Sequence, residues 1–227
     1  MTRTTNARIA GFAFLFYIAA GLSSMVLFGR ATSGDGIAAK LAGIAQHATE
    51  VRVVLLLNLL TSFSALVLGV TLYSITREQD PDLAMLALIC RVVEGLNAVA
   101  GISGTQRLLW LATATGANAP DIGATHALGA FLLNGGGAGP IFFAVGSTLF
   151  SWLFLRGRMI PVALAWLGVL ASILLVVITP LQTAGLFGGS GSWGSSVTWL
   201  MWLPMLAFEV TLALWLLIKG VAAPATR

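Results

Sequence analysis

The chain has 227 residues, of which 58% are hydrophobic and only 9% charged, with a formal net charge of +4. Soluble domains carry about 25% charged residues, so this composition excludes an ordinary soluble domain and indicates a polytopic membrane protein. A basic excess can indicate a nucleic-acid partner, but no basic patch interleaved with aromatic residues is present. We therefore expect the lipid bilayer, and no nucleic acid, as a partner.

Six stretches are long and apolar enough to cross a bilayer, which requires about 20 helical residues. In chain order they cover residues 9–28, 53–75, 83–108, 137–155, 162–181 and 197–218. We predict an all-α fold: a polytopic integral membrane protein built as a six-transmembrane-helix bundle. The bundle forms a single membrane domain over residues 1–227, since no polar stretch is long enough for a second domain.

The segment at residues 36–51, between the first two spans, has apolar residues at helical spacing: Ile37, Leu41, Ile44, Ala48 and Val51. This pattern predicts a short amphipathic helix that lies on the outer surface of the membrane. A lid that closes over a substrate site is the alternative interpretation.

Basic residues are distributed unequally between the two faces of the predicted bundle. Seven lie on the face that holds both termini, against three on the other face, which are Arg30, Lys40 and Arg52. Because cytoplasmic loops carry the excess of Lys and Arg, we predict that both termini are cytoplasmic. The seven are Arg3, Arg8, Arg77, Arg156, Arg158, Lys219 and Arg227.

The third span places Arg91, Glu94 and Asn97 three residues apart, on one helical face. A charged side chain at the bilayer centre costs about 2.5–3.5 kcal/mol on insertion scales and faces the bundle interior, where it finds partners. Counting about 1.5 Å of rise per residue from the cytoplasmic face puts Arg91 and Tyr17 about 13 Å deep and Glu209 about 15 Å deep. We predict that spans one, three and six meet, with Arg91 paired to Glu209 and Tyr17 within hydrogen-bonding reach.

One arginine cannot neutralise two carboxylates, so one carboxyl group of this cluster is expected to hold a proton. Interpreted structurally, the cluster is a polar clip that sets helix packing. Interpreted functionally, it is a proton or ion relay or the anchor of a substrate pocket. Gly95, Gly101 and Gly104 of the same span are expected to let a neighbouring helix approach closely.

The sequence offers few residues for a disulfide, a metal site or a catalytic centre. The one cysteine, Cys90, excludes an intramolecular disulfide and fits no metal-binding spacing. His47 and His126 lie in outer segments without the cluster that a metal site requires. Neither an HExxH pair nor a Gly-x-Ser-x-Gly elbow occurs. We expect no metal and no cofactor, assign no catalytic residue, and consider an enzyme the less favoured class.

Several stretches resemble one bacterial membrane-protein family. They are "RIAGFAFLFYIAAGLSS" at residues 8–24, "IFFAVGSTLFSWLFLRGRMIPVALAWLGVL" at 141–170 and "WLPMLAFEVTLALWLLIKGV" at 202–221, together with "CRVVEG" in the third span. The family is named domain of unknown function 4386. The resemblance implies a six-helix protein of the bacterial cytoplasmic (inner) membrane and implies no activity. The glycine-rich segment at residues 121–139 departs from the family pattern.

Three hypotheses about function follow from these observations. The first is small-molecule or ion/proton-linked transport or sensing through the buried Arg-Glu-Glu-Tyr cluster. The second is a structural or assembly subunit that acts as a homo-oligomer or with a partner membrane protein and has no activity of its own. The third is an intramembrane lipid-modifying enzyme, for which no nucleophile or metal constellation is evident.

Overall fold

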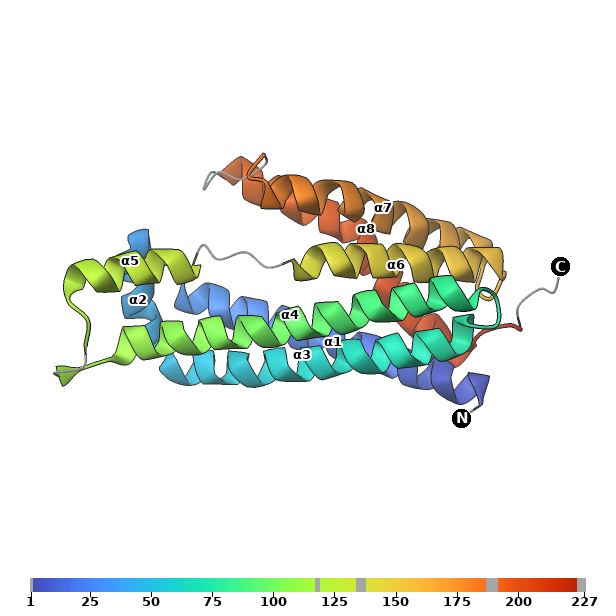
Figure 1. Cartoon of the computed structure of the whole chain (residues 1–227), viewed down its shortest axis with the longest axis horizontal. Coiled ribbons are helices and arrows are strands. Elements are labelled where there is room, and N and C mark those ends of the chain that lie inside the picture. Colours follow the sequence, from blue (N-terminus) through green and yellow to red (C-terminus); the bar gives the residue numbers. More distant parts are fainter. Residues whose placement is uncertain (1, 117–118, 134–137, 187–191, 224–227) are drawn as a thin grey trace. The chain divides into compact units, whose positions relative to one another are not determined.

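The computed structural model describes residues 2–116, 119–133, 138–186 and 192–223, with only the backbone described at 192–198. Within these ranges the regular structure is helical and contains no strand. Figure 1 labels the helices and colours them by their order in the chain. Their bounds are α1 Arg3–Ala31, α2 Gly36–Gln46, α3 Ala48–Thr76, α4 Pro81–Thr113, α5 Ile122–Leu133, α6 Gly139–Arg156, α7 Val162–Thr183 and α8 Ser192–Ile218.

Six of these helices are long and apolar enough to cross a membrane: α1, α3, α4, α6, α7 and, in α8, Trp199–Ile218. Their lengths, from 18 to 33 residues, match the hydrocarbon thickness that a helix must span. The predicted all-α, six-helix membrane fold is confirmed, and the chain is a multi-pass membrane protein. Residue 137, at the start of the predicted fourth span, lies outside the described residues. The orientation in the membrane stays a prediction.

Proline marks two of the helix starts. Pro81 is the first residue of α4, and Pro140 occupies the first turn of α6, where a missing backbone N–H removes no helical hydrogen bond. Two prolines lie inside helices instead, Pro180 in α7 and Pro204 in α8. Each of these removes one backbone hydrogen bond from its helix and favours a kink there.

The chain forms two compact units, which are described separately. The first unit comprises Met1–Phe16, Ser64–Gly95 and Ala138–Arg227, and the second comprises Tyr17–Phe63 and Leu96–Gly137. The helices α1, α3 and α4 contribute residues to both units. The prediction of a single membrane domain stays a prediction.

In the first unit, α6 packs along α7 and α7 packs along α8 (Figure 1). Glycine allows the close approach of α7 to its neighbours. A Cβ atom added at Gly168 of α7 would lie 2.5 Å from the ring of Phe208 in α8 and 2.7 Å from the hydroxyl of Ser151 in α6. A Cβ atom added at Gly11 of α1 would lie 2.6 Å from the backbone oxygen of Ala213 in α8. Small residues at these crossings allow helix backbones to approach closely in a membrane.

One end of the first unit holds ion pairs and backbone contacts between helix termini. Arg3 pairs with Glu78, and Arg156 pairs with Asp80 at 3.0 Å. The backbone N–H of Ala222, beyond α8, donates to the carbonyl of Met159 at 3.0 Å. These contacts hold together chain segments that are far apart in the sequence.

The second unit has its own apolar core. Leu41 and Ile44 of α2 lie in a buried cluster with Ala31, Val51, Leu108 and Leu111, and α2 also packs against α5. The segment predicted as one amphipathic helix over residues 36–51 is divided between α2, which ends at Gln46, and α3, which begins at Ala48. The apolar spacing continues across this break because both helices bury their residues in the same core. Its place on the outer surface, and the lid alternative, stay predictions.

Candidate functional site

The site begins with an ion pair inside α4. Arg91 and Glu94 are three residues apart and therefore share a helical face. The guanidinium Nη1 of Arg91 donates to Oε2 of Glu94 at 2.9 Å. Only 1% of the arginine surface is exposed, and Glu94 is also buried. Such a charge-assisted bond holds both side chains in a fixed geometry.

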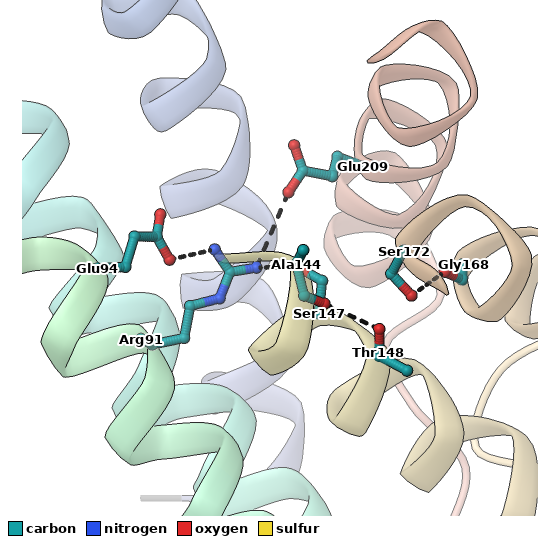
Figure 2. Close-up of polar contacts among 8 residues, drawn as sticks. All are labelled: Arg91, Glu94, Ala144, Ser147, Thr148, Gly168, Ser172 and Glu209. Atoms are coloured by element: carbon teal, nitrogen blue, oxygen red, sulfur yellow. Dashed lines mark hydrogen bonds and ion pairs between the residues drawn. The ribbon is translucent and has the colours of Figure 1, made fainter. Parts of the chain in front are cut away.

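Helix α6 supplies a second partner for Arg91. Nη2 of the guanidinium donates to the hydroxyl of Ser147 at 2.9 Å, as Figure 2 shows. Four residues earlier on the same helix, the ring of Phe143 lies 4.8 Å from the guanidinium carbon. An aromatic face at this distance attracts a cation, and more strongly when water is excluded. Ser147 and Phe143 therefore hold Arg91 from one face of α6.

Helix α8 contributes the second carboxylate. Oε1 of Glu209 lies 3.9 Å from Nη2 of Arg91, and in Figure 2 the side chain points toward the guanidinium. Glu209 is buried, and its Oε1 atom accepts no hydrogen bond from the described part of the chain. The guanidinium thus lies between two buried carboxylates, one at hydrogen-bonding distance and one in a longer ion pair.

Aromatic side chains complete the surroundings of the guanidinium. The ring of Phe14 in α1 lies 6.0 Å from the guanidinium carbon. The ring of Trp202 in α8 lies 5.6 Å from that of Phe143 in a tilted arrangement. Both phenylalanines are buried. Because aromatic rings exclude water, the charges in this site interact in a medium of low dielectric constant.

Two glycines make room for the aliphatic part of Arg91. A Cβ atom added at Gly69 of α3 would lie 3.0 Å from the Cβ of Arg91, and one added at Gly146 of α6 would lie 3.8 Å from its Cγ. The Cβ added at Gly146 would also lie 3.1 Å from the Cβ of Cys90. The arginine can therefore lie deep in the first unit because neither neighbouring helix has a side chain at these points.

The structure brings together three of the five residues predicted for the cluster, Arg91, Glu94 and Glu209, within the first unit. Tyr17 and Asn97, both half-buried, belong to the second unit, so their relation to the cluster stays a prediction. Whether the five residues act as a functional site also stays a prediction.

The glycines predicted to receive a neighbouring helix were not all identified correctly. Among the residues that the structure describes, a Cβ atom added at Gly101 or Gly104 meets nothing within 4 Å, so the prediction is wrong for these two. Close approach instead occurs at Gly69 and Gly146. Spacing along a helix shows which residues share a face, but the neighbour of that face depends on how the helix is rotated in the bundle.

Sequence reasoning missed Ser147 and Phe143. A serine in an apolar helix ordinarily bonds a carbonyl of its own helix, as Ser172 does with the carbonyl of Gly168 at 2.7 Å. The available signal was the row of small residues Ala144, Ser147 and Ser151 on one face of α6, which marks a helix face that packs against another helix.

The second unit holds polar pairs of its own. Ser24 donates to the side-chain oxygen of Asn58 at 2.6 Å, and Nδ1 of His47 lies 3.2 Å from Oε1 of Glu50. Among the residues that the structure describes, no group of three or more His, Cys, Asp or Glu side chains could hold a metal ion.

Comparison with known proteins identifies one family. The family model described as "Domain of unknown function (DUF4386)" matches residues 9–220, which is nearly the whole chain and includes Arg91, Glu94 and Glu209. No curated protein matches the chain. No solved structure matches it either.

Proposed function

Since the chain belongs to the family described as Domain of unknown function (DUF4386), whose name assigns no activity, we propose a function from the buried cluster. The protein is a small-molecule or ion/proton-linked transporter or sensor of the bacterial inner membrane. Arg91, Glu94 and Glu209 form its proton-binding switch. Ionisable residues inside a membrane protein commonly mark ion pathways and proton relays.

The observation that supports this proposal is that two carboxylates pair with one guanidinium at different distances. Glu94 accepts a hydrogen bond of 2.9 Å from Arg91, whereas Glu209 lies 3.9 Å away and its nearer oxygen accepts no hydrogen bond from the described residues. A proton on Glu209 therefore disrupts the weaker of the two pairs. Glu94 and Ser147 continue to hold the arginine in either state.

The charge of the cluster changes with that proton. With all three groups ionised, one cation faces two anions, which leaves one net negative charge in an apolar setting. A proton on Glu209 makes the cluster neutral and weakens the attraction between α8 and Arg91. Loss of the proton restores this attraction. Two arrangements of α8 with different proton occupancy are what a proton-linked cycle requires.

A structural role is the second candidate. In it the chain is a packing or assembly subunit for a second copy or for a partner membrane protein. The enclosure of the guanidinium by Phe14 and Phe143 favours this candidate. A buried ion pair in a closed setting can set the register of helices without any turnover.

Proton binding can be tested on the full chain reconstituted in liposomes. Infrared difference spectra recorded between alkaline and acidic buffer report the appearance of protonated carboxyl groups. We expect one such signal to be lost in Glu209→Gln. The matched control is Glu78→Gln, because Glu78 is exposed and pairs with Arg3 outside the cluster. An unchanged signal in a normally folded Glu209→Gln variant would remove the proton-switch proposal.

Transport and sensing can be separated in the same liposomes. A potassium diffusion potential drives protons inward, and a trapped pH-sensitive dye reports their arrival. A transporter gives an inward proton movement that Glu209→Gln abolishes and Glu78→Gln retains. A sensor gives the infrared signal without proton movement.

A further inference from the structure

A second feature of the first unit lies where α1 meets α8, at the end of the unit that holds the helix termini. A Cβ atom added at Gly11 would lie 2.6 Å from the backbone oxygen of Ala213 and 2.8 Å from Cγ of Leu217. The two helices are therefore in direct contact at this level. We call this line of contact the α1/α8 seam.

Two exposed cations lie close in the sequence to the residues of the seam. Arg8 is three residues before Gly11, which is about 4.5 Å along α1. Lys219 is the first residue after the end of α8 and two residues after Leu217. Both are exposed. Neither forms an ion pair with the residues that the structure describes, whereas Arg3 and Arg156 at the same end of the unit are paired with Glu78 and Asp80.

Exposed apolar side chains lie close to each cation in the sequence, on α1 and at the end of α8. On α1, Phe12 and Phe16 follow Arg8 at four-residue intervals, so the three share one face. The rings of Phe12 and Phe16 stack with centroids 6.2 Å apart. Of the Phe12 surface, 65% is exposed. On α8, Leu214 and Ile218 are exposed before Lys219.

We propose that the end of the α1/α8 seam binds an acidic phospholipid. Arg8 and Lys219 contact its phosphate, and Phe12, Phe16, Leu214 and Ile218 contact its acyl chains. The arrangement of charge above apolar surface fits an amphiphile, whereas free phosphate would leave the apolar surface unused. An acidic lipid is favoured over a zwitterionic one because the site supplies two cations and the zwitterionic headgroup already carries a cation of its own. This proposal is independent of the proton-switch proposal.

The test uses the purified full chain in detergent and native mass spectrometry with added phosphatidylglycerol or phosphatidylethanolamine. We expect the parent chain to retain phosphatidylglycerol preferentially. Each basic residue near a membrane surface contributes about 1 kcal/mol to binding acidic lipid, so the double variant Arg8→Gln with Lys219→Gln should bind phosphatidylglycerol about 30-fold more weakly.

The matched control is Arg77→Gln with Arg158→Gln. It removes the same charge from two exposed residues of the same unit that lie outside the seam, and it should leave the retention of phosphatidylglycerol nearly unchanged. Equal loss in both double variants would overturn the proposal, since it would indicate attraction by overall charge. Equal retention of the two lipids by the parent, or displacement of phosphatidylglycerol by inorganic phosphate, would overturn it as well.

Folding is checked by comparing the melting temperatures of the two double variants. If Arg8→Gln with Lys219→Gln melts lower than the parent, the exchange Arg8→Lys with Lys219→Arg replaces it. That exchange keeps both charges and should retain the lipid. Loss of the lipid from the folded exchange variant would contradict a site that depends on charge.

Discussion

The Cβ atom of Arg91 lies 3.0 Å from the point that a Cβ atom on Gly69 would occupy. Arg91 cannot withdraw easily, because its guanidinium is held by Glu94 and Ser147. The position of the buried cation thus depends on the absence of a side chain on a neighbouring helix.

Gly69→Ala is expected to destabilise the protein by about 1–3 kcal/mol, the usual effect of adding a methyl group to a packed interior. Thermal unfolding in detergent measures this change. Gly101→Ala is the control, since its added Cβ meets no atom of the described part of the chain within 4 Å and alanine favours a helix more than glycine does. Equal melting temperatures for Gly69→Ala and the parent would show that α3 and α4 separate without penalty.

Ser147→Ala removes the hydroxyl that accepts a hydrogen bond from Nη2 of Arg91. Because hydrogen bonds to charged groups contribute about 1.5–3 kcal/mol, we expect a loss of stability in this range. Ser172→Ala is a close control. Ser172 is also buried, but its hydroxyl donates to the carbonyls of Gly168 and Val169 in its own helix. Figure 2 shows the bond to Gly168. Similar losses from both variants would argue against an interaction between Ser147 and the cation.

Replacing the whole charged cluster should be tolerated better than replacing its cation alone. Arg91→Leu leaves two buried carboxylates and should cost about 3–5 kcal/mol, whereas Arg91→Leu with Glu94→Leu and Glu209→Leu removes all three charges and should be neutral or stabilising by about 1–4 kcal/mol. The measurement is unfolding of both variants in one detergent.

The same triple variant separates the two candidate functions. If the cluster is a proton switch, the folded triple variant loses the carboxyl signal and any proton movement. If the cluster serves only packing, the parent chain gives neither the carboxyl signal nor proton movement. The triple variant then keeps the assembly state of the parent, which size-exclusion chromatography with light scattering measures. A folded triple variant that still moves protons would exclude the cluster as the switch.

The pair between Arg156 and Asp80 is predicted to contribute little. Its atoms are 3.0 Å apart, but both side chains are partly exposed, and such pairs contribute about 0.2–1 kcal/mol. A double-mutant cycle with Arg156→Gln and Asp80→Asn measures the interaction. The value should decrease further at high salt because mobile ions screen exposed charges. A coupling that is insensitive to salt would contradict this.

The sequence was sufficient to predict the six long helices and much of the cluster. Apolar run length locates the spans because hydrocarbon tolerates no unpaired backbone group. Counting residues from the membrane face placed Arg91 and Glu209 at one level, since helical rise is constant. The structure indeed has these two side chains 3.9 Å apart.

The sequence does not show how each helix is rotated about its own axis, and therefore which of its faces meets a neighbouring helix. The contact between Arg91 and Ser147 depends on which face α6 turns toward α4, and hydropathy along α6 does not distinguish its faces clearly. For the same reason the sequence predicts close helix approach at Gly101 and Gly104, whereas the structure has it at Gly69 and Gly146. The break at His47 was missed because Leu41, Ile44 and Val51 all enter one core, so their spacing continues through it.

The pairing of Arg91 with Glu94 within a single helix also bears on biosynthesis. As α4 leaves the ribosome and enters the bilayer, its cation already carries a counter-ion one turn away, so insertion of this segment does not have to wait for later ones. Glu209 is the only charged residue of α8 and is synthesised last. When Glu209 enters the membrane, Arg91 is already there and can pair with it.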